Sequence, residues 1–138
     1  MKKLSLCLVL IGFALLGGLF AQNREVWIEE DFSSGTFPPA GWTISNNAGN
    51  WSLFAGANAG GTTPELRLSW SPQFNAASYF ISPSLDTSGE TTMYLDFRHF
   101  VDHYDTPYTI GVATRSAMGA WNVVWSMNPT DDVGPELR

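Results

Sequence analysis

Large apolar side chains alternate with other residues along much of this 138-residue chain, and this two-residue period restricts the fold more than any other feature. Successive side chains of a β-strand point to opposite faces of the sheet, so the period predicts half-buried strands. The clearest cases are residues 93–101, 108–115 and 121–127. Their expected inward faces carry Met93, Leu95, Phe97 and His99, then Tyr108, Ile110 and Val112, and finally Trp121, Val123, Trp125 and Met127.

Clusters of turn-forming residues separate these segments from other candidate strands. Residues 33–41, 46–50, 56–64 and 83–89 are rich in Gly, Pro, Asn and Ser, which favour turns. Short strands about ten residues apart, with no sustained helical stripe, are typical of a sandwich or barrel. We therefore predict a single all-β domain. The shorter candidate strands are residues 25–32, 41–45, 51–55, 65–70 and 78–82.

The first 21 residues have the pattern of an export signal. Lys2 and Lys3 give a positive start, residues 4–20 are almost continuously apolar, and Ala21 offers a small side chain for cleavage. A membrane-spanning helix is the competing interpretation, because about 17 apolar residues are near the lower limit for crossing a bilayer. Positive residues lie only before the run, so we expect a cleaved signal peptide of residues 1–21. The mature protein would then be secreted or held at the cell surface, without insertion into the membrane.

The charge of the chain excludes several classes of partner. Seven Lys and Arg residues stand against thirteen Asp and Glu, a net charge of −6. Loss of Lys2 and Lys3 with the signal leaves five Arg against the same thirteen acids, a net charge of −8. Such a surface repels phosphates, so we expect no nucleic acid partner. Loss of Cys7 also leaves no cysteine for a disulfide, so stability must come from core burial, helped at most by a metal.

The order of motifs in the mature chain resembles a known family. The segments EEDFSSGTFPPAGWTISN (29–46), NWSLF (50–54), SYFISPSLDTSG (78–89) and MYLDFRHF (93–100) are similar in layout to cleaved adhesin domains, also called choice-of-anchor J domains and related to MAM domains. The resemblance covers essentially all of residues 22–138. It implies an antiparallel jelly-roll β-sandwich of the concanavalin A-like or MAM-like type. Such modules belong to secreted Bacteroidetes proteins, often beside peptidases and ahead of a type IX secretion sorting domain.

This resemblance implies a binding role and no catalysis by the module itself. We expect a non-enzymatic adhesion module that recognises an extracellular protein or carbohydrate, where an exposed Trp or Tyr can stack on a sugar. The alternative is an accessory domain of a larger secreted hydrolase or peptidase. In relatives the segment that corresponds to residues 128–138 leads into further strands. We therefore expect the domain to be truncated at its C-terminus, with unpaired aromatic-rich edges that favour self-association.

Relatives of this family commonly hold structural calcium near the first strand, where this chain has Glu29, Glu30 and Asp31. Strand alternation separates Glu30 from its two neighbours, so one ion cannot readily take all three carboxylates. Glu30 and Asp31 are our first candidates for a calcium site. Two departures from the family pattern predict weak binding, because Ser33 replaces an acid and residues 46–50 are neutral. The alternative is a solvated acidic edge that discourages strand pairing.

Motifs for catalysis are weak in this sequence. His99 and His103 have the spacing of zinc-protease histidines, but no glutamate follows His99 to serve as the base. His99 also lies in a predicted strand, where this spacing does not place two imidazoles as one face of a helix would. No GxSxG motif is present, and no cysteine nucleophile remains after cleavage. Residues 50–52 match an N-glycosylation acceptor, Asn-Trp-Ser, to which we give little weight for a bacterial protein.

A polar loop is predicted after the longest strand. It contains Asp102, His103, Tyr104 and Asp105. Loops held by a rigid scaffold often carry contact residues, so this segment is a candidate contact site. A solvated connection without a binding role is the alternative interpretation.

Overall fold

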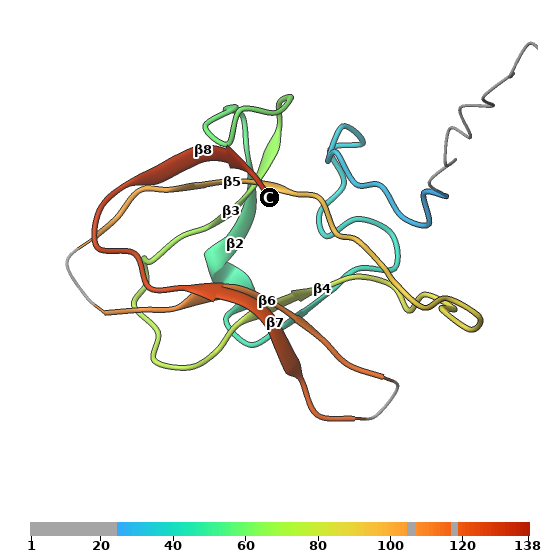
Figure 1. The fold of residues 1–138 in the computed structure, drawn as a ribbon. Coiled ribbons are helices and arrows are strands. Elements are labelled where there is room, and N and C mark those ends of the chain that lie inside the picture. The colour runs from blue at the N-terminus through green and yellow to red at the C-terminus, as the bar shows by residue number, and fades with distance from the viewer. Residues whose placement is uncertain (1–24, 105–106, 117–118) are drawn as a thin grey trace, which may run out of the picture.

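The computed structural model describes residues 25–104, 107–116 and 119–138, so the expected signal peptide lies outside the described residues. In these parts the predicted all-β class is confirmed, with eight strands and one short 3₁₀ helix (Figure 1). No helix there combines the length and apolar character needed to cross a bilayer. The elements are β1 (Thr43–Ser45), η1 (Ala48–Asn50), β2 (Trp51–Phe54), β3 (Glu65–Leu68), β4 (Tyr79–Ile81), β5 (Arg98–Val101), β6 (Ile110–Thr114), β7 (Asn122–Met127) and β8 (Val133–Leu137).

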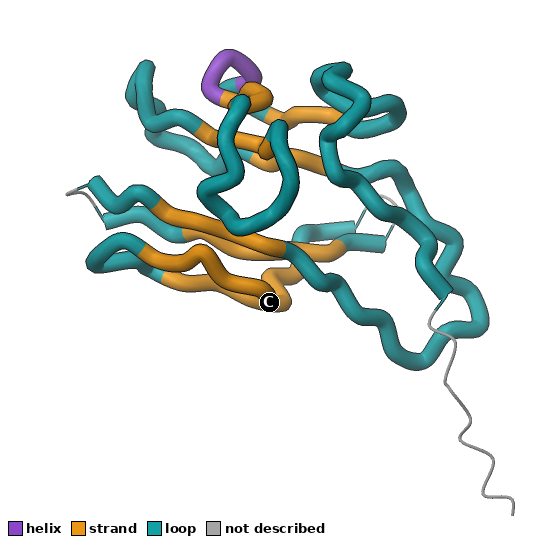
Figure 2. The backbone as a smooth tube through the Cα atoms, turned by 90° about the horizontal axis from the view of Figure 1, so that it is seen from above, coloured by secondary structure: helices purple, strands orange, loops and turns teal. Residues whose placement is uncertain are grey.

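The strands form four antiparallel pairs in two nested sets. β1 pairs with β4 around the β2–β3 hairpin, and β5 pairs with β8 around the β6–β7 hairpin. Figure 2 shows the strands in two tiers with loops around them. This arrangement is compatible with a β-sandwich, in which two layers cover each other's apolar faces.

The predicted alternation is confirmed where strands form. Phe97 and His99 are half-buried while Arg98 between them is exposed, and Ile110 and Val112 are half-buried on β6. Both segments are rich in β-branched or aromatic residues, which fit a pleated half-buried surface. The expectation was wrong for Met93 and Leu95, which are exposed and precede Phe97, the first residue that exchanges backbone hydrogen bonds with the β8 segment.

A β-bulge changes the inward face of β7. Val112 pairs with Trp125 and the next residue, Ala113, pairs with Val123, so Val124 is the extra residue. Because a bulge shifts the two-residue phase, Val123 is 62% exposed, and its predicted inward position is wrong. Trp125 remains half-buried beyond the bulge, as predicted.

Strand β8 was not predicted from the sequence. Its Gly134 and Pro135 look like turn residues, and both weaken the strand pattern. In the structure β8 nevertheless pairs with β5, with a register shift between His99 and Val101. A strand that contains proline is typical of a sheet edge, since proline has no N–H to donate.

One aromatic cluster centres on Phe80 of β4. Trp42 stacks on this ring with 4.6 Å between centroids, and Phe32, Phe37 and Trp51 lie at 5.7 to 6.1 Å. Trp42 and Trp51 are both half-buried. Aromatic pairs of this kind add stability beyond their buried area. The cluster therefore holds residues 32–42 against β2 and β4.

Hydrogen bonds fix the same region. The Trp51 indole N–H donates to Ser78 Oγ at 2.7 Å, and that hydroxyl donates to the Asn46 carbonyl at 2.8 Å. Gly41, directly before Trp42, has a φ of +80°, and a Cβ there would lie 3.0 Å from Pro83 Cγ. Only glycine meets both conditions without strain.

Candidate contact site at the loop end

Two connections meet at one end of the molecule, which we call the loop end: residues 102–104 and 107–109 after β5, and residues 128–132 after β7. A hydrogen bond of 2.8 Å from the His103 backbone N–H to Asp132 Oδ1 joins them. The Thr109 hydroxyl donates to Asn128 Oδ1 at 2.6 Å. The nested pairing of β5–β8 around β6–β7 brings these segments together, although they are about 29 residues apart in sequence.

His103 forms the inner part of the loop end. Its Nδ1 shares a hydrogen bond of 3.1 Å with the Tyr108 hydroxyl, and the two rings stack with 5.6 Å between centroids. Burial raises the pKa of the Tyr108 phenol, and the charges of Asp102 and Asp132 raise it further. The phenol therefore stays protonated at neutral pH and remains part of this hydrogen bond.

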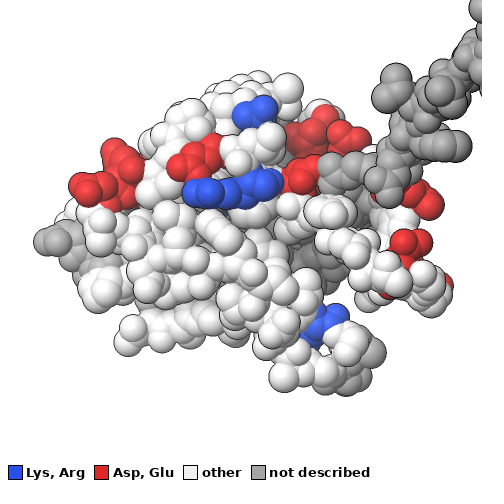
Figure 3. All heavy atoms as spheres, in the orientation of Figure 1, with Lys and Arg blue, Asp and Glu red and all other residues white. Residues whose placement is uncertain are grey.

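The outer part of the loop end is exposed and acidic. Tyr104 is 69% exposed, and the carboxylates of Asp102, Asp131 and Asp132 also lie at the surface. Figure 3 shows acidic side chains at the left end, where Figure 1 draws these two connections. An accessible aromatic ring beside hydrogen-bond acceptors suits recognition of a ligand by contact.

The predicted polar loop thus gains two members that the sequence analysis missed. Asp102, His103 and Tyr104 lie at the loop end, while Asp105 falls outside the described residues. The sequence analysis assigned Tyr108 only to one face of a predicted strand. Because that strand begins directly after the polar loop, the sequence could have suggested that Tyr108 lies near the loop end. No sequence pattern pointed to Asp132, because its contact with His103 depends on the unpredicted strand β8.

The calcium candidates Glu30 and Asp31 lie in a tight turn. Glu30 Oε1 accepts a hydrogen bond of 2.6 Å from the Phe32 N–H, and Asp31 Oδ1 accepts one of 2.9 Å from the Ser33 N–H. The bonds from Ser33 lower the pKa of Asp31. Both carboxylates therefore stabilise the turn in which Phe32 has a φ of +61°. Among the described residues, no group of three or more His, Cys, Asp or Glu is placed to hold a metal. Calcium binding by Glu30 and Asp31 stays a prediction.

The two histidines have different surroundings. The ring of His99 contacts Phe97 and Trp125, whereas His103 contacts Tyr108. The expectation that their four-residue spacing does not build a zinc site stays a prediction. Asn50 of the possible glycosylation motif is only 5% exposed, so its side chain is not accessible to a modifying enzyme in the folded chain.

Comparisons with protein-family models, with curated proteins and with solved structures gave no match to this chain. The likeness to cleaved adhesin domains therefore rests on the motifs of the sequence.

Proposed function

We propose that this chain is a non-catalytic extracellular binding module with a jelly-roll sandwich fold, and that the loop end recognises carbohydrate. The observation that carries the proposal is the exposed ring of Tyr104 in a segment that also carries the surface carboxylate of Asp102 and is bonded through His103 to Asp132. The resemblance to cleaved adhesin domains and the signal-like residues 1–21 support an extracellular location.

The chemistry of the loop end suits a sugar. The apolar face of a pyranose can stack on Tyr104, while carboxylate oxygens of Asp102 accept hydrogen bonds from neighbouring hydroxyls. His103 and Asp132 hold the segment that carries Tyr104, so less conformational freedom is lost on binding. A protein ligand is the other class to which the same surface could bind, and the experiment below separates the two.

The test compares binding by wild type, Tyr104→Ala and Asp102→Asn on a printed oligosaccharide array and on a panel of immobilised extracellular matrix proteins. We expect oligosaccharide binding, with an affinity about tenfold lower for each variant, since one stacking or charge-assisted contact is worth about 1 to 1.5 kcal/mol. Tyr94→Ala is the matched control, because Tyr94 is a similarly exposed tyrosine that precedes β5, whereas the loop end follows β5.

Two results would contradict the proposal. Binding only to matrix proteins, lost in the same two variants, would make the loop end a protein-recognition site. Oligosaccharide binding that Tyr104→Ala and Tyr94→Ala reduce equally would place the sugar elsewhere.

A further inference from the structure

His99 of β5 is half-buried, and its two ring nitrogens have an unusual environment. Both ring nitrogens are shielded from solvent, and neither has a hydrogen-bond partner among the described residues. The neighbours of the ring are aromatic: Phe97 lies at 5.7 Å and Trp125 of β7 at 5.5 Å between centroids. His99 therefore sits where the β5–β8 pair packs against the β6–β7 pair.

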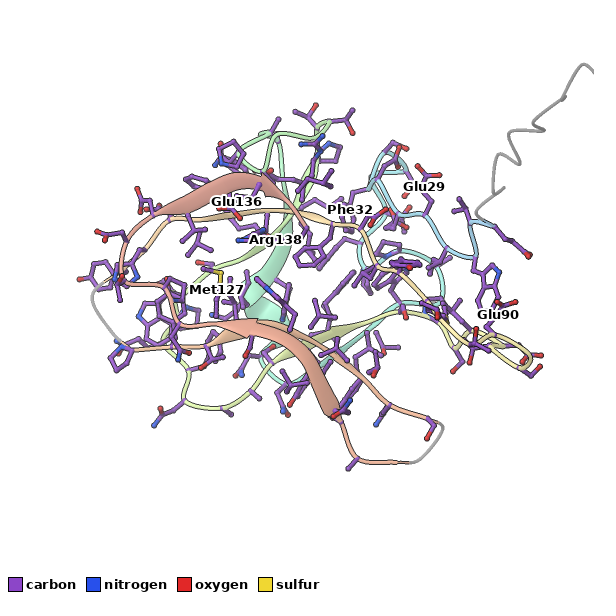
Figure 4. The ribbon with its side chains drawn as sticks, in the orientation of Figure 1. Glu29, Phe32, Glu90, Met127, Glu136 and Arg138 are labelled. Atoms are coloured by element: carbon purple, nitrogen blue, oxygen red, sulfur yellow. The ribbon has the colours of Figure 1, made fainter. Side chains whose placement is uncertain are left out.

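Two charged side chains, those of Glu136 and Arg138, share the face of the β5–β8 pair that carries His99. In the β5–β8 register His99 lies opposite Glu136, and Phe97 exchanges backbone hydrogen bonds with Arg138, so all four side chains share one face. The Glu136 carboxylate forms an ion pair with the Arg138 guanidinium (Figure 4). β6 and β7 carry no charged residue, and Arg98 of β5 points to the opposite face.

We propose that His99 is a pH-sensitive element that loosens the packing of β5–β8 on β6–β7 when the solution becomes mildly acidic. The imidazolium form has two N–H donors and a full charge. At this position neither donor has an acceptor among the residues that the structure describes, the facing rings supply none, and Glu136 is already paired with Arg138. A buried charge without partners opposes folding, so protonation favours the loosened state.

The position of His99 connects this element to the loop end. β5 leads directly into residues 102–104, and β7, which carries Trp125, leads into residues 128–132. Separation of the two strand pairs would stretch both connections of the loop end, because each connection joins a strand of the β5–β8 pair to a strand of the β6–β7 pair. The packing change itself does not depend on which ligand the loop end binds.

The experiment measures the melting temperature of the full chain between pH 7.5 and pH 5.5 by circular dichroism, for wild type, His99→Phe and His103→Gln. His99 and His103 are the two histidines of the sequence, so the second variant removes the other imidazole. We expect the wild-type melting temperature to fall by about 5 °C on acidification. His99→Phe should lose most of this fall and His103→Gln should keep it.

Glu136→Gln removes the carboxylate that lies opposite His99, and so tests the competing effect, in which this carboxylate stabilises the charged ring. If Glu136 stabilised the charged ring, the wild type would become more stable toward pH 5.5, and this result would overturn the proposal. A fall of equal size in His99→Phe, or a flat wild-type profile, would overturn it as well. Should His99→Phe fail to fold, His99→Leu gives the same comparison with a smaller side chain.

Discussion

Asn50 shows how one side chain can hold three segments. It is the polar residue that the described part of the chain buries most deeply, and it closes η1 through a backbone hydrogen bond of 2.9 Å to Asn47. Its Nδ2 donates to the carbonyls of Ser69 at 2.8 Å and Pro72 at 2.7 Å. A buried amide is stable only when its donors are satisfied, so Asn50 has a structural role here rather than one as a glycan acceptor.

We predict that Asn50→Ala lowers the free energy of unfolding by about 1 to 3 kcal/mol, because two carbonyls lose their donor. Asn50→Asp should lower it at least as much, since a carboxylate would face the same two carbonyl oxygens. Urea denaturation measures both. Asn75→Ala, at an exposed position, should stay within about 0.5 kcal/mol of wild type. A similar loss in the Asn75 and Asn50 variants would show that the amide contacts do not matter.

At the scale of elements, strand existence could be predicted from the sequence but strand phase and strand pairing could not. Alternation depends only on neighbouring residues, so β5, β6 and β7 were found. The bulge at Val124 depends on how two strands pair, and β8 forms because β5 offers it a partner despite Pro135. For the same reason, only part of the loop end could be predicted. Tyr104 lies in a loop that the sequence predicts, whereas Asp132 reaches His103 only because β8 forms.

The position of the bulge in β7 can be tested by making the same Val→Thr substitution at two positions. Val112→Thr places a hydroxyl on the half-buried face opposite Trp125 and should lower the free energy of unfolding by about 1 to 2 kcal/mol. Val123→Thr should change it by less than about 0.5 kcal/mol, because Val123 is exposed. Threonine favours strands as valine does, so backbone propensity is matched. Equal losses in thermal or urea unfolding would mean that Val123 points inward and the bulge is absent.

At the scale of the whole molecule, the aromatic rings contact one another but stay partly accessible to solvent. The described residues include no apolar side chain that is fully buried, although many aromatic rings contact one another. Each strand there has one hydrogen-bonded partner, so each pair presents two open edges. Exposed edges and half-covered aromatic faces are recurrent causes of association between chains. These strand edges and aromatic faces are the surfaces through which we expect the self-association that the sequence predicts.

We predict that the chain self-associates at micromolar concentration and binds the dye ANS under native conditions, because apolar surface remains accessible. Val124→Lys should reduce association, since it places a charge at an apolar position of β7 that is 56% exposed. Sedimentation velocity over a range of concentrations measures this effect. Thr130→Lys, which adds the same charge at an exposed loop position, is the matched control and should leave association closer to wild type. A concentration-independent monomer without ANS fluorescence would contradict the prediction, and it would mean that the two tiers cover their aromatic rings in solution without help from another chain.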